Sequence, residues 1–225
     1  MNRVVLPIFL VLSLAVSGCT GLGTLNRASK PNDLYALTPK STFSSNLPRI
    51  KQQIVVEEPT ATAAVNTDQI AVQPTPLQVQ YLPQARWVDR APLIVQALLI
   101  ESFENTGKVA AVGRSAVGLR ADYHVVTDLR EFQAHVLTGA DDKPVLRVNV
   151  RINVKIVEAY DDKIIASNSF EALEVSASDD AGDLAIAFDE ALGDTMRKAV
   201  EWSIRRIHTH AVNNPRPALP PLPEG

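Results

Sequence analysis

The clearest structural signal in this 225-residue chain is a stretch past its midpoint in which apolar and polar residues alternate without a break. It reads Leu146-Arg147-Val148-Asn149-Val150-Arg151-Ile152-Asn153-Val154-Lys155-Ile156. Because successive side chains of a β-strand point to opposite faces, this period of two predicts a strand with one buried face and one wet face. One-sided strands of this kind are typical of antiparallel sheets.

The segments on either side of this strand predict a β-meander. Residues 121–136 favour β-structure and are followed by a polar loop that ends at Pro144. On the other side, Asp161-Asp162-Lys163 is typical of a tight turn, and residues 164–175 then return as the next strand. We therefore expect three consecutive antiparallel strands.

Shorter strands are expected in the N-terminal half. Residues 54–56, 70–72 and 77–82 are rich in β-favouring side chains, and each run is followed by a proline (Pro59, Pro74 and Pro83) that is expected to end it. Residues 34–37 predict a further short strand.

A first helix is expected to begin near Trp87–Pro92, with Asp89 as its N-cap and Pro92 in its first turn, and to end at about Asn105 before Gly107. One face is apolar and is expected to enter the core. It comprises Ile94, Val95, Leu98, Leu99 and Phe103. A second apolar sector leaves two readings open, a helix covered by loops or a face used for self-association. It comprises Leu93, Ala97 and Ile100.

A second, longer helix is expected from the cap at Ser178–Asp180 to about His210. Leu184, Phe188, Ala191 and Leu192 begin its apolar stripe. Together the elements predict an α+β fold, a two-layer sandwich in which two helices pack on one face of a largely antiparallel or mixed β-sheet. Residues 212–225 are rich in proline and are expected to form an extended tail.

The N-terminus predicts a secretory signal over residues 1–18, because Arg3 precedes an apolar run over residues 4–16. The run ends in Val16-Ser17-Gly18-Cys19, which resembles the bacterial lipobox. That resemblance implies cleavage before Cys19, a diacylglycerol on its sulfur and an N-acyl chain such as palmitate on the new amino terminus. Residues 19–50 are then expected to be a lipidated N-terminus and flexible tether, and residues 51–211 the folded domain.

Composition and motifs give little support to catalysis or to nucleic-acid binding. The net charge of −3 argues against a protein that grips phosphates, and one cysteine excludes a disulfide within the chain. His208 and His210 lie two positions apart and do not share a helix face, and His124 and His135 have no motif around them. Arg147, Arg151 and Lys155 form a basic stripe, which is either a solvated strand face or a contact for anionic lipid or an acidic partner. We expect no enzymatic activity, no bound cofactor and no metal.

With these elements in order, the chain resembles the ABC-type transport auxiliary lipoproteins, which are paired with MCE-type intermembrane lipid transport systems of diderm bacteria. The resemblance covers residues 32–211 and rests on the cysteine motif and on a few segments. They are Tyr35-Ala36-Leu37, Ile54-Val55-Val56, Trp87-Val88-Asp89-Arg90-Ala91-Pro92, Ala121-Asp122-Tyr123 and Leu129-Arg130-Glu131-Phe132.

The resemblance implies a non-enzymatic subunit that is anchored in the outer membrane through Cys19 and faces the periplasm. Its implied partner is the MCE-domain protein of the transporter, its implied cargo a phospholipid, and its implied assembly a homo-oligomeric ring. The alternative is an envelope-assembly lipoprotein that partners an outer-membrane β-barrel.

Overall fold

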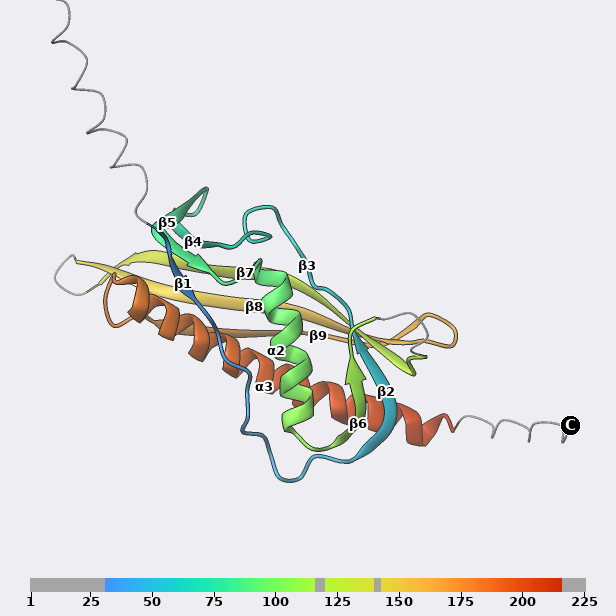
Figure 1. Cartoon of the computed structure of the whole chain (residues 1–225). Coiled ribbons are helices and arrows are strands. Elements are labelled where there is room, and N and C mark those ends of the chain that lie inside the picture. Colours follow the sequence, from blue (N-terminus) through green and yellow to red (C-terminus); the bar gives the residue numbers. More distant parts are fainter. Residues whose placement is uncertain (1–30, 116–119, 140–142, 216–225) are drawn as a thin grey trace, which may run out of the picture. The chain divides into compact units, whose positions relative to one another are not determined.

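The computed structural model describes residues 31–115, 120–139 and 143–215 of the chain. In this part of the chain, nine strands form one mixed sheet, and two helices pack against it (Figure 1). The helices and the inner sides of the central strands contribute to one buried apolar cluster. The α+β class expected from the sequence is confirmed.

The predicted meander is present as β7 (Tyr123–Thr138), β8 (Pro144–Glu158) and β9 (Lys163–Val175). All three strands are antiparallel, with Thr127 opposite Val154 and Ile152 opposite Phe170. A register shift between Leu129 and Glu131 of β7 inserts one extra residue, so that Leu129 and Phe132 both reach the buried face. The alternating stretch over residues 146–156 therefore lies in the central strand of the meander.

The second edge of β7 is shared among three shorter strands that all run parallel to it. They are β2 (Ile50–Val56), β3 (Thr60–Ala61) and β4 (Gln69–Thr75), which meet β7 one after another along its length. Beyond them, β6 (Val109–Gly113) pairs with β2, and β5 (Gln78–Trp87) pairs with β4 and borders β1 (Asp33–Tyr35). The strands β3 and β6 were not expected from the sequence.

Strand β5 extends past the proline that was expected to end it. It continues through Pro83 to Trp87, and Gln84 has a φ of 59°. The pairing with β4 changes register between Tyr81 and Arg86, so the strand bulges at this place. Proline is compatible with a bulge because the missing N–H is not needed there for the ladder.

Helix α2 (Ala91–Asn105) buries all five residues of its predicted core face. Its N-cap is Arg90 and not Asp89, and Arg90 makes no side-chain capping bond. Asp89 accepts a hydrogen bond from the backbone N–H of Arg90 at 2.7 Å, because it lies one residue too early to reach the first turn. At the other end, Gly107 has a φ of 60° and its N–H donates to the carbonyl of Glu104, as expected of a C-terminal stop.

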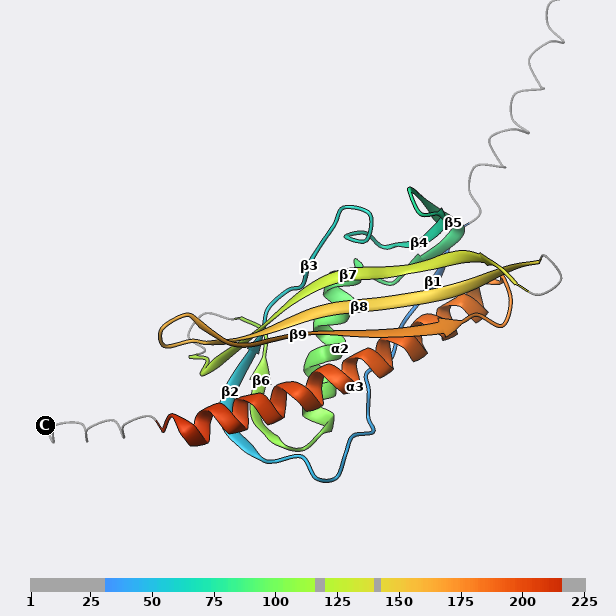
Figure 2. The same ribbon diagram turned by 180° about the vertical axis from the view of Figure 1, so that it is seen from behind.

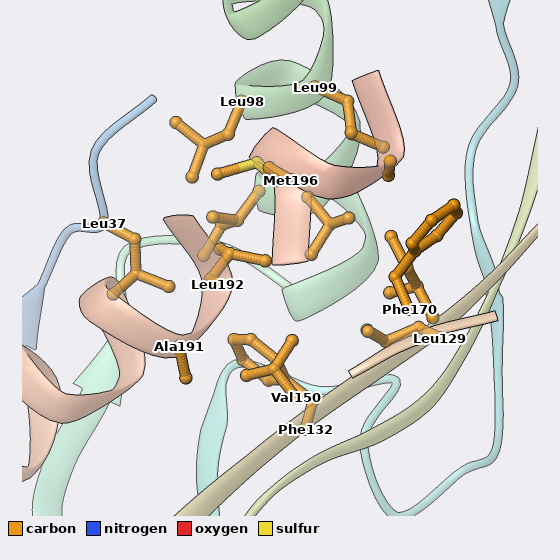
Figure 3. Packing of buried hydrophobic residues seen from close by; sticks show 14 of the residues in the cluster. Leu37, Leu98, Leu99, Leu129, Phe132, Val150, Phe170, Ala191, Leu192 and Met196 are labelled. Carbon is orange, nitrogen blue, oxygen red and sulfur yellow. The ribbon is translucent and has the colours of Figure 1, made fainter. Parts of the chain in front are cut away.

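Helix α3 (Ala181–Asn213) begins as predicted, since Asp180 is the N-cap and its Oδ1 accepts from the N–H of Gly182 at 2.8 Å. The helix runs three residues beyond the predicted end. Its apolar stripe lies across β8 and β9, and Ala191, Leu192 and Met196 are fully buried there (Figure 3). Deeper in the core, Trp87, Phe132 and Phe188 form a cluster with ring centroids 5.0–5.7 Å apart.

Residues 34–49, which the sequence analysis placed in a flexible tether, belong to the compact unit that begins at Leu34. Leu37 and Leu47 are buried, and Leu37 joins the same cluster as Leu192 (Figure 3). Side chains of the two helices also bind this segment through its backbone, which local composition does not reveal. We call residues 36–47 the strap.

Candidate functional surface

The outer face of the meander is the main polar surface that the fold presents. The inner face of β7–β9 is covered by the apolar cluster, whereas the opposite face of β8 carries the polar half of the alternating stretch. In this part of the chain no helix packs on that side, as the view from behind shows (Figure 2). We call this surface the outer face; on β8 it comprises Arg147, Asn149, Arg151, Asn153 and Lys155.

Hydrogen bonds between neighbouring strands order the middle of the outer face. The guanidinium of Arg151 donates to Oε1 of Glu131 at 2.6 Å, and the other oxygen of Glu131 accepts from the amide of Gln133. Asn153 is only 7% exposed because its Nδ2 donates to Oγ of Ser169 at 3.0 Å and to the carbonyl of Asn168 at 3.1 Å. Hydrogen bonds between neighbouring strands therefore fix the side chains in the middle of the outer face.

Two cations at the ends of this array are available to a partner. Within the described residues, neither Arg147 nor Lys155 takes part in an ion pair. The Nε of Arg147 and the Oδ1 of neighbouring Asn149 have no hydrogen-bond partner there. The Nε of Arg151 and the Oδ1 of Asn153 also lack a hydrogen-bond partner in the described part of the chain, so these buried unpaired atoms do not distinguish one end of the face from its middle.

A small hollow lies at the other side of the sheet, beside the end of α3. It encloses about 130 Å³ and is lined by Lys51, Gln52, Asp122, Tyr123, Ala211 and Asn214. The Tyr123 hydroxyl lies 2.9 Å from Nδ1 of His210, and this contact joins the end of α3 to the start of β7. Pockets for drug-sized ligands are about 300–1,000 Å³, so this hollow suits at most a very small molecule.

One further polar contact was not visible in the sequence. The Nδ1 of His124 lies 2.7 Å from Oε1 of Glu57, which is far away along the chain. The pair forms because β2 runs beside β7 in parallel, a pairing that no local motif announces. Within the described residues, no group of three or more His, Cys, Asp or Glu side chains could hold a metal ion.

On α3, Asp194 is held by two cations one helical turn further on. Burial raises the pKa of its carboxyl, but the hydrogen bonds from Lys198 and Arg197 outweigh this effect and lower the pKa below its ordinary value. The Nζ of Lys198 lies 2.7 Å from Oδ2 of Asp194, and Arg197 binds the other oxygen. This site stabilises the helix surface and lies apart from the outer face.

The structure describes the candidate self-association residues but not the candidate lipidation residue. Cys19 lies outside the described residues. Leu93, Ala97 and Ile100 are all half-buried, and Ile100 packs against the apolar cluster. The strap reaches this helix, since the N–H of Lys40 donates to Oγ of Ser102 at 3.0 Å. In the described part of the chain no helix is long and apolar enough to cross a membrane.

Comparison with known proteins agrees with this fold. An uncharacterized protein of Bradyrhizobium diazoefficiens is 28% identical over 161 residues, which are 70% of this chain and 41% of that protein. The chain thus spans about two fifths of the length of that relative. A crystal structure from Xanthomonas campestris, described as DUF330, matches with a TM-score of 0.73 and 27% identity. The match covers 80% of this chain and 99% of that one.

A second crystal structure, of an uncharacterized protein, shares the fold with a TM-score of 0.58 at 10% identity and covers 79% of this chain. The sequence model of the ABC-type transport auxiliary lipoprotein component family matches residues 35–200, from β1 to the middle of α3. The matched region includes the strap and the strands β2 to β9. The chain therefore belongs to the ABC-type transport auxiliary lipoprotein component family.

Proposed function

We propose that this chain is a non-enzymatic, outer-membrane-anchored subunit of an MCE-type lipid transport system and that it docks the transporter at the periplasmic side of that membrane. The observation that carries the proposal is the outer face, an ordered polar surface on a sheet whose other side is fully packed. Membership of the ABC-type transport auxiliary lipoprotein component family supports association with an ABC transport system.

Cys19 is the proposed anchor. It is the only cysteine of the chain and follows directly after an apolar segment. Two or more acyl chains on one residue give stable membrane binding, because each buried CH₂ contributes about 0.8 kcal/mol. We propose phospholipid as the cargo, with several copies forming a ring through the sector Leu93, Ala97 and Ile100.

Docking is tested by capture of an MCE-domain protein from the same bacterium. Arg147→Ala together with Lys155→Ala is expected to weaken capture at least severalfold, because these two cations of the outer face, unlike Arg151, form no ion pair with any described residue. Arg206→Ala is the matched control, since Arg206 is an exposed cation on α3. Equal capture by all variants would remove the outer face from the interface, and capture of a β-barrel in place of an MCE protein would favour the alternative function.

The anchor is tested by Cys19→Ala. The variant is expected to leave the outer-membrane fraction for the soluble periplasmic fraction, because no acyl chain can be attached at this position. Sedimentation of the variant with the outer membrane, after a carbonate wash, would contradict anchoring through Cys19.

A further inference from the structure

The hairpin formed by β4 and β5 is the one long segment of this fold without charge. Residues 69–85 contain no Asp, Glu, Lys, Arg or His, whereas 21% of the whole chain is charged. Pro76 and Leu77 lie at its turn, and the six residues that follow the turn are mostly exposed. A surface segment in water has no need to exclude charge over such a length.

Apolar side chains gather at the tip of this hairpin. Leu77 is 99% exposed, and Val79 and Tyr81 follow at spacings of two with 42% and 38% exposed. Val79 and Tyr81 share one side of β5 because side chains alternate along a strand, and Leu77 precedes them in the turn. The Tyr81 hydroxyl is already paired with the carbonyl of Ala64 at 3.3 Å, so the ring is held in place.

The path of the chain points to what covers these side chains. Strand β1 borders β5, so the polypeptide coming from Cys19 enters the fold beside the hairpin. Leu34 on β1 is itself 65% exposed. Leu34 lies fifteen positions after Cys19, a length of chain that reaches at most about 50 Å when fully extended. The hairpin therefore lies where the chain that leads to the proposed anchor joins the fold.

A second hairpin provides the contrast. The β8–β9 turn lies at the opposite end of the long strands (Figures 1 and 2). Its tip also exposes a large side chain, Tyr160 at 80%, but Asp161, Asp162 and Lys163 surround it. Charged side chains oppose entry into the acyl boundary, whereas Leu, Val and Tyr favour it.

We propose that the β4–β5 hairpin is a second, non-covalent membrane contact, whose tip residues Leu77, Val79 and Tyr81 enter the interfacial layer of the bilayer that holds the anchor. Interfacial segments bury apolar side chains by about 5–10 Å at the headgroup boundary. The inference rests on the proposed lipid anchor at Cys19. With two points of contact, the lipidated domain would have a defined orientation on the membrane and the outer face would be presented to the periplasm.

The test uses the full chain, produced in a diderm bacterium and reconstituted into vesicles of phosphatidylethanolamine and phosphatidylglycerol. Because Cys19 is the only cysteine, acylation leaves no free thiol, and Leu77→Cys creates a single site for an NBD label. Val79→Cys provides a second site on the hairpin, in case the loss of Leu77 weakens the contact. Tyr160→Cys is the control.

We expect NBD emission at positions 77 and 79 to shift to the blue in vesicles and to be quenched by nitroxide-labelled phospholipid, with no change at position 160. Water-like emission at both hairpin positions in floated, acylated protein would overturn the hairpin contact and leave the anchor intact. A shift that depends on protein concentration and resists the lipid quencher would overturn it in favour of a second copy. If the unsubstituted chain fails to float and its Cys19 reacts with the thiol reagent, both proposals fall.

Discussion

Gln96 illustrates at the scale of one residue how the fold departs from a helical wheel. The wheel places it outside the predicted core face, in the sector that also carries Leu93, Ala97 and Ile100, yet it is 6% exposed. Its Nε2 donates to the carbonyl of Val56 at 3.0 Å and so satisfies a backbone acceptor at the end of β2. A buried amide is tolerated because it is hydrogen-bonded, and its partner is 40 residues away in sequence.

A pH-dependent contribution to stability is expected from Asp194. The folded-state pKa is lowered, so the ionised carboxylate stabilises the fold above its unfolded pKa, and this contribution is lost as the pH falls through the folded value. Partly exposed pairs of this kind contribute about 0.3–1 kcal/mol. Asp194→Asn should lower the free energy of unfolding by that amount at pH 7, measured by urea denaturation.

At pH 3 the difference between Asp194→Asn and the unsubstituted chain should shrink, because the carboxyl binds a proton in part of the molecules. Glu190→Gln is the control, since Glu190 is exposed on the same helix and makes no ion pair within the described residues. An equal difference at both pH values would show that Asp194 acts through packing and not through charge.

At the scale of elements, the strap is the feature that most changes the domain boundary. The carboxylate of Asp189 on α3 accepts from the N–H of Thr38 at 2.6 Å and from its hydroxyl at 2.8 Å. Glu201, about three turns further on, accepts from the N–H and the hydroxyl of Ser44 at 2.8 and 3.0 Å. Two carboxylates of one helix thus fix a segment of irregular backbone.

Asp189→Ala is expected to loosen the strap without unfolding the sheet. Charge-assisted hydrogen bonds contribute about 1.5–3 kcal/mol where they are shielded, and this one is exposed, so a loss of about 1 kcal/mol is expected. Hydrogen exchange of residues 36–44 should accelerate, whereas exchange in β8 should not change. Glu190→Ala is the control, because Glu190 is exposed and lies next to Asp189, and it should leave hydrogen exchange in both regions unchanged. Unchanged, slow exchange of residues 36–44 in the Asp189 variant would show that Asp189 does not hold the strap.

Several elements were predictable because their signals are local. The alternation in β8, the Asp-Asp-Lys turn before β9, the Asp180 cap and the Gly107 stop each depend on a few adjacent residues. The strands β3 and β6 gave no such signal, since they have two and five residues and are stabilised by pairing with strands far along the chain. The continuation of β5 through Pro83 likewise depends on the bulge against β4.

At the scale of the whole molecule, self-association through α2 is the open structural prediction. Leu93 and Ala97 are half-buried and lie outside the core cluster, so a charge introduced there tests an interface more cleanly than Ile100, which packs against the core. Light scattering of the chain in detergent is expected to give a multiple of the mass of one copy. Leu93→Glu with Ala97→Glu should return it to a single copy.

A control on the other helix is Ile186→Glu, because Ile186 is 59% exposed on α3. It should leave the mass unchanged. If the unsubstituted chain and the α2 variant both have the mass of one copy, and dilution does not change it, a ring formed through this helix would be contradicted.

The sequence by itself determined the local features of this protein: the strand with one wet and one buried face, the two helices with the cap at Asp180, and the cysteine motif at residue 19. Only the tertiary structure showed that three parallel strands share one edge of β7, that the strap packs on both helices, and that an uncharged hairpin protrudes beside the entry of the chain. The physical reason is sequence distance. Caps, turns and alternation act between adjacent residues, whereas these contacts join segments tens of residues apart and form only when the shared core brings them together.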